Sequence, residues 1–326
     1  MKPRYIHFLM LLALFVSTGA SCPRSRQVIN DPAPIVLQPQ ASLEDVIRVV
    51  NTNSAGIRQV QSAGATLSIP GMPRLDATYA FERPKRFRMR AETNLLGPQV
   101  DMGSNDTDYW MWVKYSEEPG VYYGRHDYFD QSAARQMLPV PPDWLIEALG
   151  VVELDPTGRH DGPRTVRPGQ LEIRSFVPST AGMITRIMVV DDTRGWILEQ
   201  HLFDNAQRPL ASAVASGFEY DPNSGASLPR VVEVHLPTAQ LNFTLETERH
   251  LINQLQGDPN QLWSLPQING VPLVNLDRLP ALQGSSPTLM ARRPQRYARQ
   301  DSPPPSDERS PRRLPQPQVF NNLRLR

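Results

Sequence analysis

The feature that most constrains the fold is an apolar period of two that runs through the middle of the chain. Between residues 59 and 247, apolar and polar side chains alternate in short runs, which predicts strands with one buried face. Most runs are joined by short links such as 191–195 and 221–225, and short links between consecutive strands favour antiparallel pairing. We expect about eleven strands. The alternating runs lie at 59–69, 74–81, 86–91, 99–102, 108–113, 121–123, 171–177, 183–190, 196–203, 211–220, 230–236 and 241–247.

Helical spacing occurs before this alternation begins and again within it. Ser42 can cap a helix, Asp45 can complete a capping box, and the apolar residues of 43–50 then share one broad face. A helical interlude is expected at 131–137 and again at 143–149. Since a sheet of this size and twist tends to curl, we predict a mainly β (α+β) fold. Its architecture is an unclosed, strongly curved antiparallel β-barrel with helices in the concavity.

The chain begins with the pattern of a secretory signal. Lys2 and Arg4 precede a short apolar run at 8–16, and small residues then lead to Cys22, the single cysteine. The apolar run is shorter than the roughly 20 residues that cross a bilayer as a helix. The segment resembles the lipobox of bacterial lipoproteins, in which the cysteine is lipidated and becomes the first residue of the mature protein. Ordinary signal cleavage, for instance after Ala20, is the alternative.

Proline marks the segments that flank the globular part. The 33 prolines are about twice the usual share, and they gather towards both ends. We expect a signal peptide at 1–21, a lipidated cysteine with a Pro-rich tether at 22–41 and a folded domain at 42–280. A disordered tail is expected at 281–326. Nine arginines against three acidic residues make the tail basic, so it could meet an anionic surface such as lipid or cell-wall polymer; an inert tail is the alternative.

The chain carries none of the sequence patterns that commonly mark catalysis. It has no His-Glu-x-x-His motif, no Gly-x-Ser-x-Gly elbow, no P-loop and no glycine-rich dinucleotide turn. The acidic pairs at 117–118 and 191–192 lie in turn-like contexts, where solvated loop charge is the simpler interpretation. We therefore expect a protein that is not an enzyme, with no metal and no cofactor. The formal charge of +1 gives no case for a specific nucleic-acid partner.

A basic run opens the third group of alternating residues. Arg86, Arg88 and Arg90 alternate with apolar residues, so on a strand the three arginines share one face. Such a face is usually solvated, although it could also meet phosphate headgroups. We expect the three guanidinium groups to lie in solvent.

Several stretches are similar to the LolA/LolB-like group of bacterial lipoprotein carriers and receptors. Residues 84–90 resemble the Pro-x-x-Phe/Leu-Arg strand of that group, and 94–97 resemble the exposed apolar loop of the receptor. Residues 103–112 resemble the hairpin that follows the loop. Residues 138–150 resemble the helix that plugs the concavity. The resemblance covers about 42–250.

This resemblance implies an unclosed β-barrel whose apolar concave face holds acyl chains. It also implies that Leu95 and Leu96 contact the membrane or an acyl chain, with ordinary packing under the loop as the alternative. The cavity would have four candidate lining residues, for which plain core packing is the other interpretation: Trp110, Trp112, Trp144 and Trp196.

The functional hypothesis follows from the signal and the resemblance together. We expect a lipoprotein of the cell envelope, anchored through Cys22, with the outer membrane favoured, that faces the periplasm. Its partners would be membrane lipids or an acylated lipoprotein, and its role lipoprotein or lipid transport. The alternative is a non-catalytic envelope scaffold or cell-wall interaction protein. A continuous apolar cavity on the concave face would favour lipid, whereas a filled core would favour the scaffold.

Overall fold

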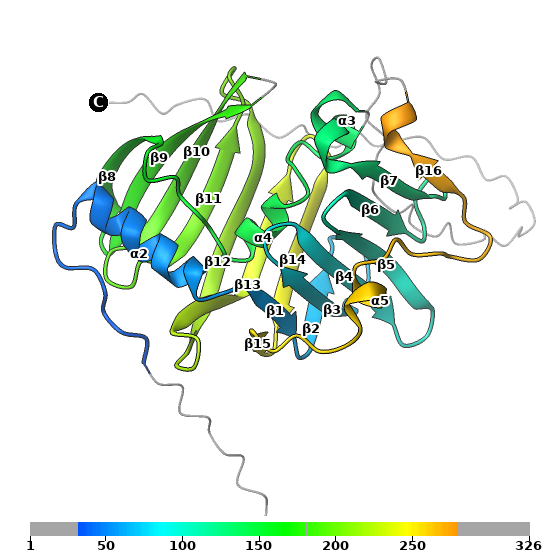
Figure 1. Ribbon diagram of the computed structural model, residues 1–326, viewed down its shortest axis with the longest axis horizontal. Helices are drawn as coiled ribbons and strands as arrows, with labels where there is room; N and C mark the ends of the chain where they lie inside the picture. Colours follow the sequence, from blue (N-terminus) through cyan, green and yellow to red (C-terminus); the bar gives the residue numbers. More distant parts are fainter. Residues whose placement is uncertain (1–31, 133, 180–181, 280–326) are drawn as a thin grey trace, which may run out of the picture. The chain divides into compact units, whose positions relative to one another are not determined.

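Sixteen β-strands form one sheet in the computed structural model, which describes residues 32–132, 134–179 and 182–279 (Figure 1). The predicted fold class is confirmed, because the sheet is large, curved and unclosed and few helices accompany it. The expected signal peptide, Cys22 and the basic tail lie outside the described residues. The strands are β1 (Gln59–Ser62), β2 (Ala65–Ser68), β3 (Leu75–Glu82), β4 (Arg86–Thr93), β5 (Gly97–Ser104), β6 (Asp108–Val113), β7 (Val121–Arg125), β8 (Arg159–Arg167), β9 (Gln170–Ser179), β10 (Gly182–Asp191), β11 (Ile197–Phe203), β12 (Pro209–Asp221), β13 (Ala226–Leu236), β14 (Leu241–Thr247), β15 (His250–Ile252) and β16 (Leu273–Asn275).

The sheet consists of two consecutive meanders joined by one long-range pairing. Its strand order is β16-β7-β6-β5-β4-β3-β2-β14-β13-β12-β11-β10-β9-β8, and β1 pairs with β3 and β15 off this path. Thr244 opposite Ser68 begins the antiparallel register of β14 with β2, which joins the meanders. The pairing of β16 with β7 is parallel. Since β8 and β16 end this order without pairing to each other, the described sheet is not closed.

The predicted number of about eleven strands is too low, for three physical reasons. The run at 59–69 turns at Gly64, where φ is +91°, so it forms both β1 and β2. Strand β8 is polar and largely exposed, and as an end strand that pairs only with β9 it needs no apolar alternation. Strands β15 and β16 have three residues each, too few to show a period.

The first described helix begins as the sequence predicts. The Ser42 hydroxyl accepts from the Asp45 backbone N–H at 3.2 Å, and the Asp45 carboxylate accepts from the Ser42 N–H at 3.3 Å. The apolar face of α2 packs across β9, β10 and β11, where Val46 and Val50 belong to one buried cluster with Met188. No described helix is both long and apolar enough to span a bilayer. The helices are α2 (Leu43–Ala55), η1 (His126–Gln131), α3 (Ala134–Met137), α4 (Trp144–Ala148), α5 (Pro259–Leu262) and η2 (Leu276–Arg278).

Helix α4 lies over the middle of the sheet, as expected for a helix in the concavity, whereas α3 packs beside β6 (Figure 1). Trp144 and Ile146 on α4 are buried in the largest apolar cluster, together with residues of β3, β4, β13 and β14. Two polar contacts fix α4 to the second meander. The Gln200 amide donates to the Glu147 carbonyl at 2.7 Å, and Arg186 Nη2 donates to Glu147 Oε2 at 2.5 Å. Polar contacts with the second meander and apolar contacts with both meanders thus hold α4 in place.

Candidate functional site

The turn between β4 and β5 carries the two leucines that the sequence singled out. Leu95 is 90% exposed and Leu96 is 50% exposed. The turn is held by its own polar groups, because Thr93 Oγ1 accepts from the Leu96 N–H at 3.0 Å and the Gln99 amide donates to the Gly97 carbonyl at 2.8 Å. Neither leucine is therefore needed for packing inside the domain. Their contact with a membrane or an acyl chain stays a prediction.

A second loop lies beside this turn and was not identified from the sequence. Lys114 Nζ donates to the Leu96 carbonyl at 2.6 Å and lies 5.6 Å from the ring centre of Tyr115, which is also exposed. Leu95, Leu96, Lys114 and Tyr115 are called the apolar tip below. Exposed leucines beside a tyrosine and a lysine are a combination of side chains that also occurs at membrane interfaces. These four residues lie together because β5 pairs with β6. No pattern in the sequence near either loop predicts this contact.

An apolar pocket lies between the interlude and the concave face of the sheet. Its volume of about 40 Å³ is small, about the space of one water molecule. The concave face is thus filled in this structure. A filled concave face is the arrangement that we expect of a scaffold. An acyl chain would fit there only after the segment 138–145 had moved away from the sheet. The apolar lining includes Met102, Leu138, Trp144, Leu145, Leu241 and Phe243.

An indole N–H in this lining has no hydrogen-bond partner among the described residues. The indole Nε1 of Trp144 is buried and makes no hydrogen bond within the described ranges. Buried indole N–H groups usually find an acceptor, because an unmade hydrogen bond costs about 1–3 kcal/mol. A carbonyl oxygen of a bound molecule could satisfy this donor.

The four tryptophans do not line one cavity. Trp144 and Trp110 both line the apolar pocket, although the indole of Trp110 packs with that of Trp112 under residues 263–271 on the opposite face. Trp196 stacks on Phe218, with ring centres 4.7 Å apart. Trp112 lines the outer-face groove and Trp196 a third cavity, so the role as lining of a ligand pocket stays a prediction that concerns Trp110 and Trp144. A period of two shows that Trp110 and Trp112 share a face, but it does not show which face.

The expectation that the three arginines of β4 are solvated is wrong for Arg88. Its guanidinium is buried against Asp101, with Nη2 and Oδ2 2.7 Å apart. Its Nη1 donates to the carbonyls of Gln261, Leu262 and Ser264 at 3.0, 3.1 and 3.0 Å. Arg88 therefore fastens the C-terminal segment 261–271 to the outer face of the sheet.

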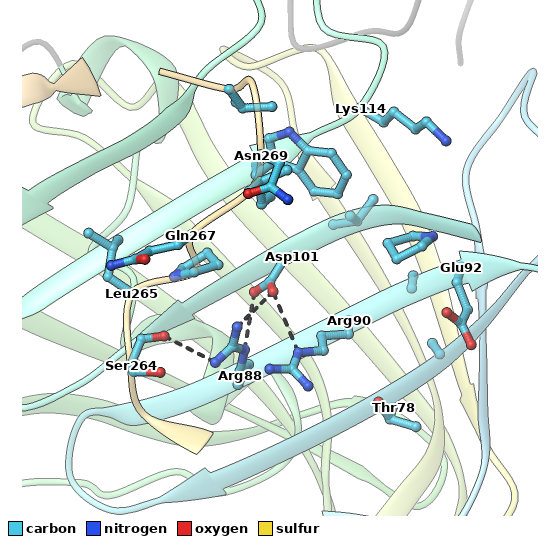
Figure 2. Close-up of a pocket in the computed structure, with 18 of the residues that line it drawn as sticks. Thr78, Arg88, Arg90, Glu92, Asp101, Lys114, Ser264, Leu265, Gln267 and Asn269 are labelled. Carbon is cyan, nitrogen blue, oxygen red and sulfur yellow. Dashed lines mark hydrogen bonds and ion pairs between the residues drawn. The ribbon is translucent and has the colours of Figure 1, made fainter. Parts of the chain in front are cut away.

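A groove of about 1190 Å³ runs beside this segment, over the outer face of β3–β6 (Figure 2). Arg90 and Lys114 contribute positive charge to it, and Glu92 contributes negative charge. The amide side chains of Gln267 and Asn269 form part of the wall. Because the lining carries both signs of charge, the groove does not select an anion or a cation.

Carboxylates in turns have structural roles here. The pair at 117–118 is exposed, as expected. Asp191 Oδ1 accepts from the backbone N–H groups of Thr193 and Arg194 at 3.0 and 2.6 Å, so this carboxylate shapes its own loop. No group of three or more metal-ligating side chains occurs in the described part of the chain.

No protein-family model and no curated protein matches the sequence. Three solved structures have a similar arrangement, at 7–11% identity. A domain assigned to outer membrane lipoprotein sorting from Vibrio parahaemolyticus has 7% identity and a TM-score of 0.46, over 66% of this chain and 94% of that one. A DUF1329 family protein from Desulfovibrio piger has 10% identity and a TM-score of 0.44, over 67% and 94%. A LolA superfamily protein from Nitrosomonas europaea has 11% identity and a TM-score of 0.39, over 67% and 96%.

The three solved structures are similar to this protein in the path of the backbone. At such identities the similarities describe the fold alone.

Proposed function

We propose that this protein is an envelope lipoprotein that binds an acyl chain, either of a membrane lipid or of a lipidated protein, and takes part in lipid or lipoprotein transport. The observation that carries the proposal is the apolar tip. Leu95 and Leu96 project from a turn that needs neither of them for packing. Exposed leucines contribute nothing to folding, so their place at a tip indicates a contact outside the domain.

The energy available at the tip is large enough for reversible binding. Burying two leucines in an acyl region contributes about 3–6 kcal/mol, at about 1.5–3 kcal/mol each. This changes partitioning by about two orders of magnitude or more. Reversible contact suits a carrier or receptor, which must leave the surface again or pass its cargo on.

The acyl chain would occupy the apolar pocket after the segment 138–145 moves. The pocket is lined almost entirely by apolar side chains, as a site for an acyl chain must be. Trp144 Nε1 supplies one unpartnered donor for an ester or amide carbonyl at the head of the chain. Cys22 would hold the domain at the membrane through the Pro-rich residues that precede Val36, about 13 residues with an extended reach of up to about 40 Å.

The test compares binding of two double variants to vesicles. The Leu95→Glu/Leu96→Glu variant should lose about two orders of magnitude in binding to phosphatidylethanolamine–phosphatidylglycerol vesicles, with little change in Tm. The matched control is Val166→Glu/Val177→Glu, which changes exposed apolar residues of β8 and β9 and should bind as the unaltered protein does. Equal binding of both variants would remove the membrane contact. A large fall in Tm of the first variant would show that the leucines are part of the core.

The filled concave face favours a second function, the non-catalytic scaffold. Mass spectrometry of the native protein distinguishes the two functions. Co-purified acyl lipid in stoichiometric amount supports acyl binding. Lipid-free protein that also fails to take up a fluorescent fatty acid supports the scaffold.

A further inference from the structure

A separate cavity lies beneath the first described residues of the chain. It has a volume of about 270 Å³ and is enclosed by 33–36, α2, the turn between β10 and β11, and the hairpin of β12 and β13. The backbone N–H groups of Val36 and Leu37 donate to the Thr193 carbonyl at 2.9 and 3.0 Å. These bonds hold the N-terminal segment over the cavity. The polar side chains of the lining are Arg48, Thr52, Asn53, Arg194, Tyr220 and Ser227.

The loop that carries Arg194 is held in place by the surrounding chain. Asp191 accepts from the Arg194 N–H, and Gly195 has φ +68°, which favours glycine. A Cβ at Gly195 would collide with Cγ1 of Val49 on α2. The loop therefore packs directly on the helix, and Arg194 starts from a fixed backbone position.

The side chain of Arg194 is also held in place, but not all of its N–H groups have a hydrogen-bond acceptor in the described part of the chain. Its guanidinium carbon lies 5.0 Å from the ring centre of Trp196, and that ring stacks on Phe218 at an interplanar angle of 6°. Its Nε is buried and has no hydrogen-bond partner among the residues that the structure describes. A guanidinium that lies over an indole can still donate hydrogen bonds to another group.

The charged side chains of the lining are both positive, although the Asp191 carboxylate lies close by, where it accepts from the Arg194 N–H at 2.6 Å. The lining contains two arginines and no aspartate or glutamate. Arg48 pairs with Asp45 at 2.5 Å, but both side chains are well exposed, so that pair is weak. Tyr220 adds a hydroxyl group to the lining. A donor-rich cavity without a carboxylate in its lining is suited to an anion.

We propose that this cavity binds a phosphate group, as free phosphate or as the phosphate of an anionic lipid headgroup. Arginine presents several donors in a plane that matches phosphate oxygens, and such charge-assisted bonds are strong. The rim carries two exposed apolar residues, Ile35 at 68% and Val36 at 43%. Apolar side chains beside a phosphate site suit a lipid, whose headgroup and acyl chains adjoin. This site is distinct from the acyl pocket and does not depend on it.

The experiment measures phosphate binding by calorimetry on the mature chain with Cys22→Ser, which removes any anchor. Inorganic phosphate should bind at one saturable site, and Arg194→Gln should weaken that binding by at least about tenfold. Arg208→Gln is the matched control, because Arg208 is an exposed arginine paired with Asp204 at a comparable turn. It should bind phosphate as the parent does.

A second variant covers the case in which Arg194→Gln lowers the melting temperature. Arg48 is exposed on α2, so Arg48→Gln should leave the fold unchanged and weaken phosphate binding by about threefold or more. Absence of saturable binding in the parent, or parent-like binding by Arg48→Gln and a folded Arg194→Gln, would overturn the proposal.

Vesicles then distinguish the two sources of phosphate. Binding to phosphatidylglycerol vesicles that depends on Arg194 and is displaced by inorganic phosphate identifies a lipid headgroup. Equal vesicle binding of the parent and Arg194→Gln, together with Arg194-dependent binding of inorganic phosphate, identifies free phosphate. The basic tail is the same in every variant, so it cancels in these comparisons.

Discussion

Arg88 and Asp101 are diagonal neighbours on β4 and β5, and they form a buried two-bond ion pair on the outer face of the sheet. The Arg88 Nε to Asp101 Oδ1 distance is 3.2 Å, and the Nη2 to Oδ2 distance is 2.7 Å. The indole Nε1 of Trp110 donates to the same Oδ1 at 3.2 Å. Because Asp101 engages Nε and Nη2, it aims Nη1 at the three carbonyls of the C-terminal segment. The pair thus positions a segment more than 150 residues away in sequence.

Replacing Arg88 should release this segment. Arg88→Met leaves the buried carboxylate of Asp101 without its main partner, so the free energy of unfolding should fall by about 3–5 kcal/mol. Urea denaturation measures this loss, and limited proteolysis should show new cleavage within 259–271. Arg90→Gln is the control, since Arg90 is exposed and 3.5 Å from Asp101, and should cost less than about 1 kcal/mol. If Arg88→Met has the same free energy of unfolding as Arg90→Gln, the Arg88–Asp101 pair does not hold the C-terminal segment.

His250 should make the domain sensitive to acid. Burial, with a smaller effect of the positive charge of Arg230, lowers the pKa of His250 to about 4. In the unfolded chain His250 binds a proton as the pH falls below its usual pKa of about 6.5. In the folded chain it binds that proton only near pH 4. The free energy of unfolding therefore falls as the pH falls from about 6.5 to about 4. The loss between pH 7 and pH 4.5 should be about 2–3 kcal/mol.

The variant His250→Asn tests this dependence. Its free energy of unfolding should fall less between pH 7 and pH 4.5 than that of the unaltered protein. His235→Asn, on the exposed side of β13, serves as the control and should keep the full loss. If the free energy of unfolding falls equally with pH in all three proteins, groups other than His250 cause the acid sensitivity.

Trp144→Phe separates stability from binding. The change removes an N–H that is buried without a partner, so Tm should stay the same or rise slightly. If the N–H serves the carbonyl of a bound acyl chain, affinity for a fluorescent fatty-acid ester should fall by about fivefold or more. Unchanged affinity would place the acyl head elsewhere.

Cys22→Ser should release the mature chain into the soluble fraction. The reason is that a single acyl-modified residue would carry the stable anchor, while the apolar tip binds reversibly. Fractionation of cells followed by immunoblotting measures the release. Persistent sedimentation with membranes after a salt wash would contradict the lipoprotein prediction.

Local order in this protein could be predicted from the sequence alone. The period of two places most strands of both meanders, but not β8, because alternation records which side chains share a face. The capping box of Ser42 and Asp45 needs only four consecutive residues, so it was predicted correctly. The exposed tip at Leu95 follows from turn chemistry over a few positions.

The tertiary structure decided which face is covered and which distant residues meet. Arg88 shares a face with the exposed Arg90, yet it is buried because the segment 261–271 returns over it. The four residues of the apolar tip come from two hairpins. Arg194 and Arg48 line the same cavity only because the loop that carries Arg194 packs on α2. These contacts depend on strand pairing and packing over the whole sheet, and a local period carries no information about either.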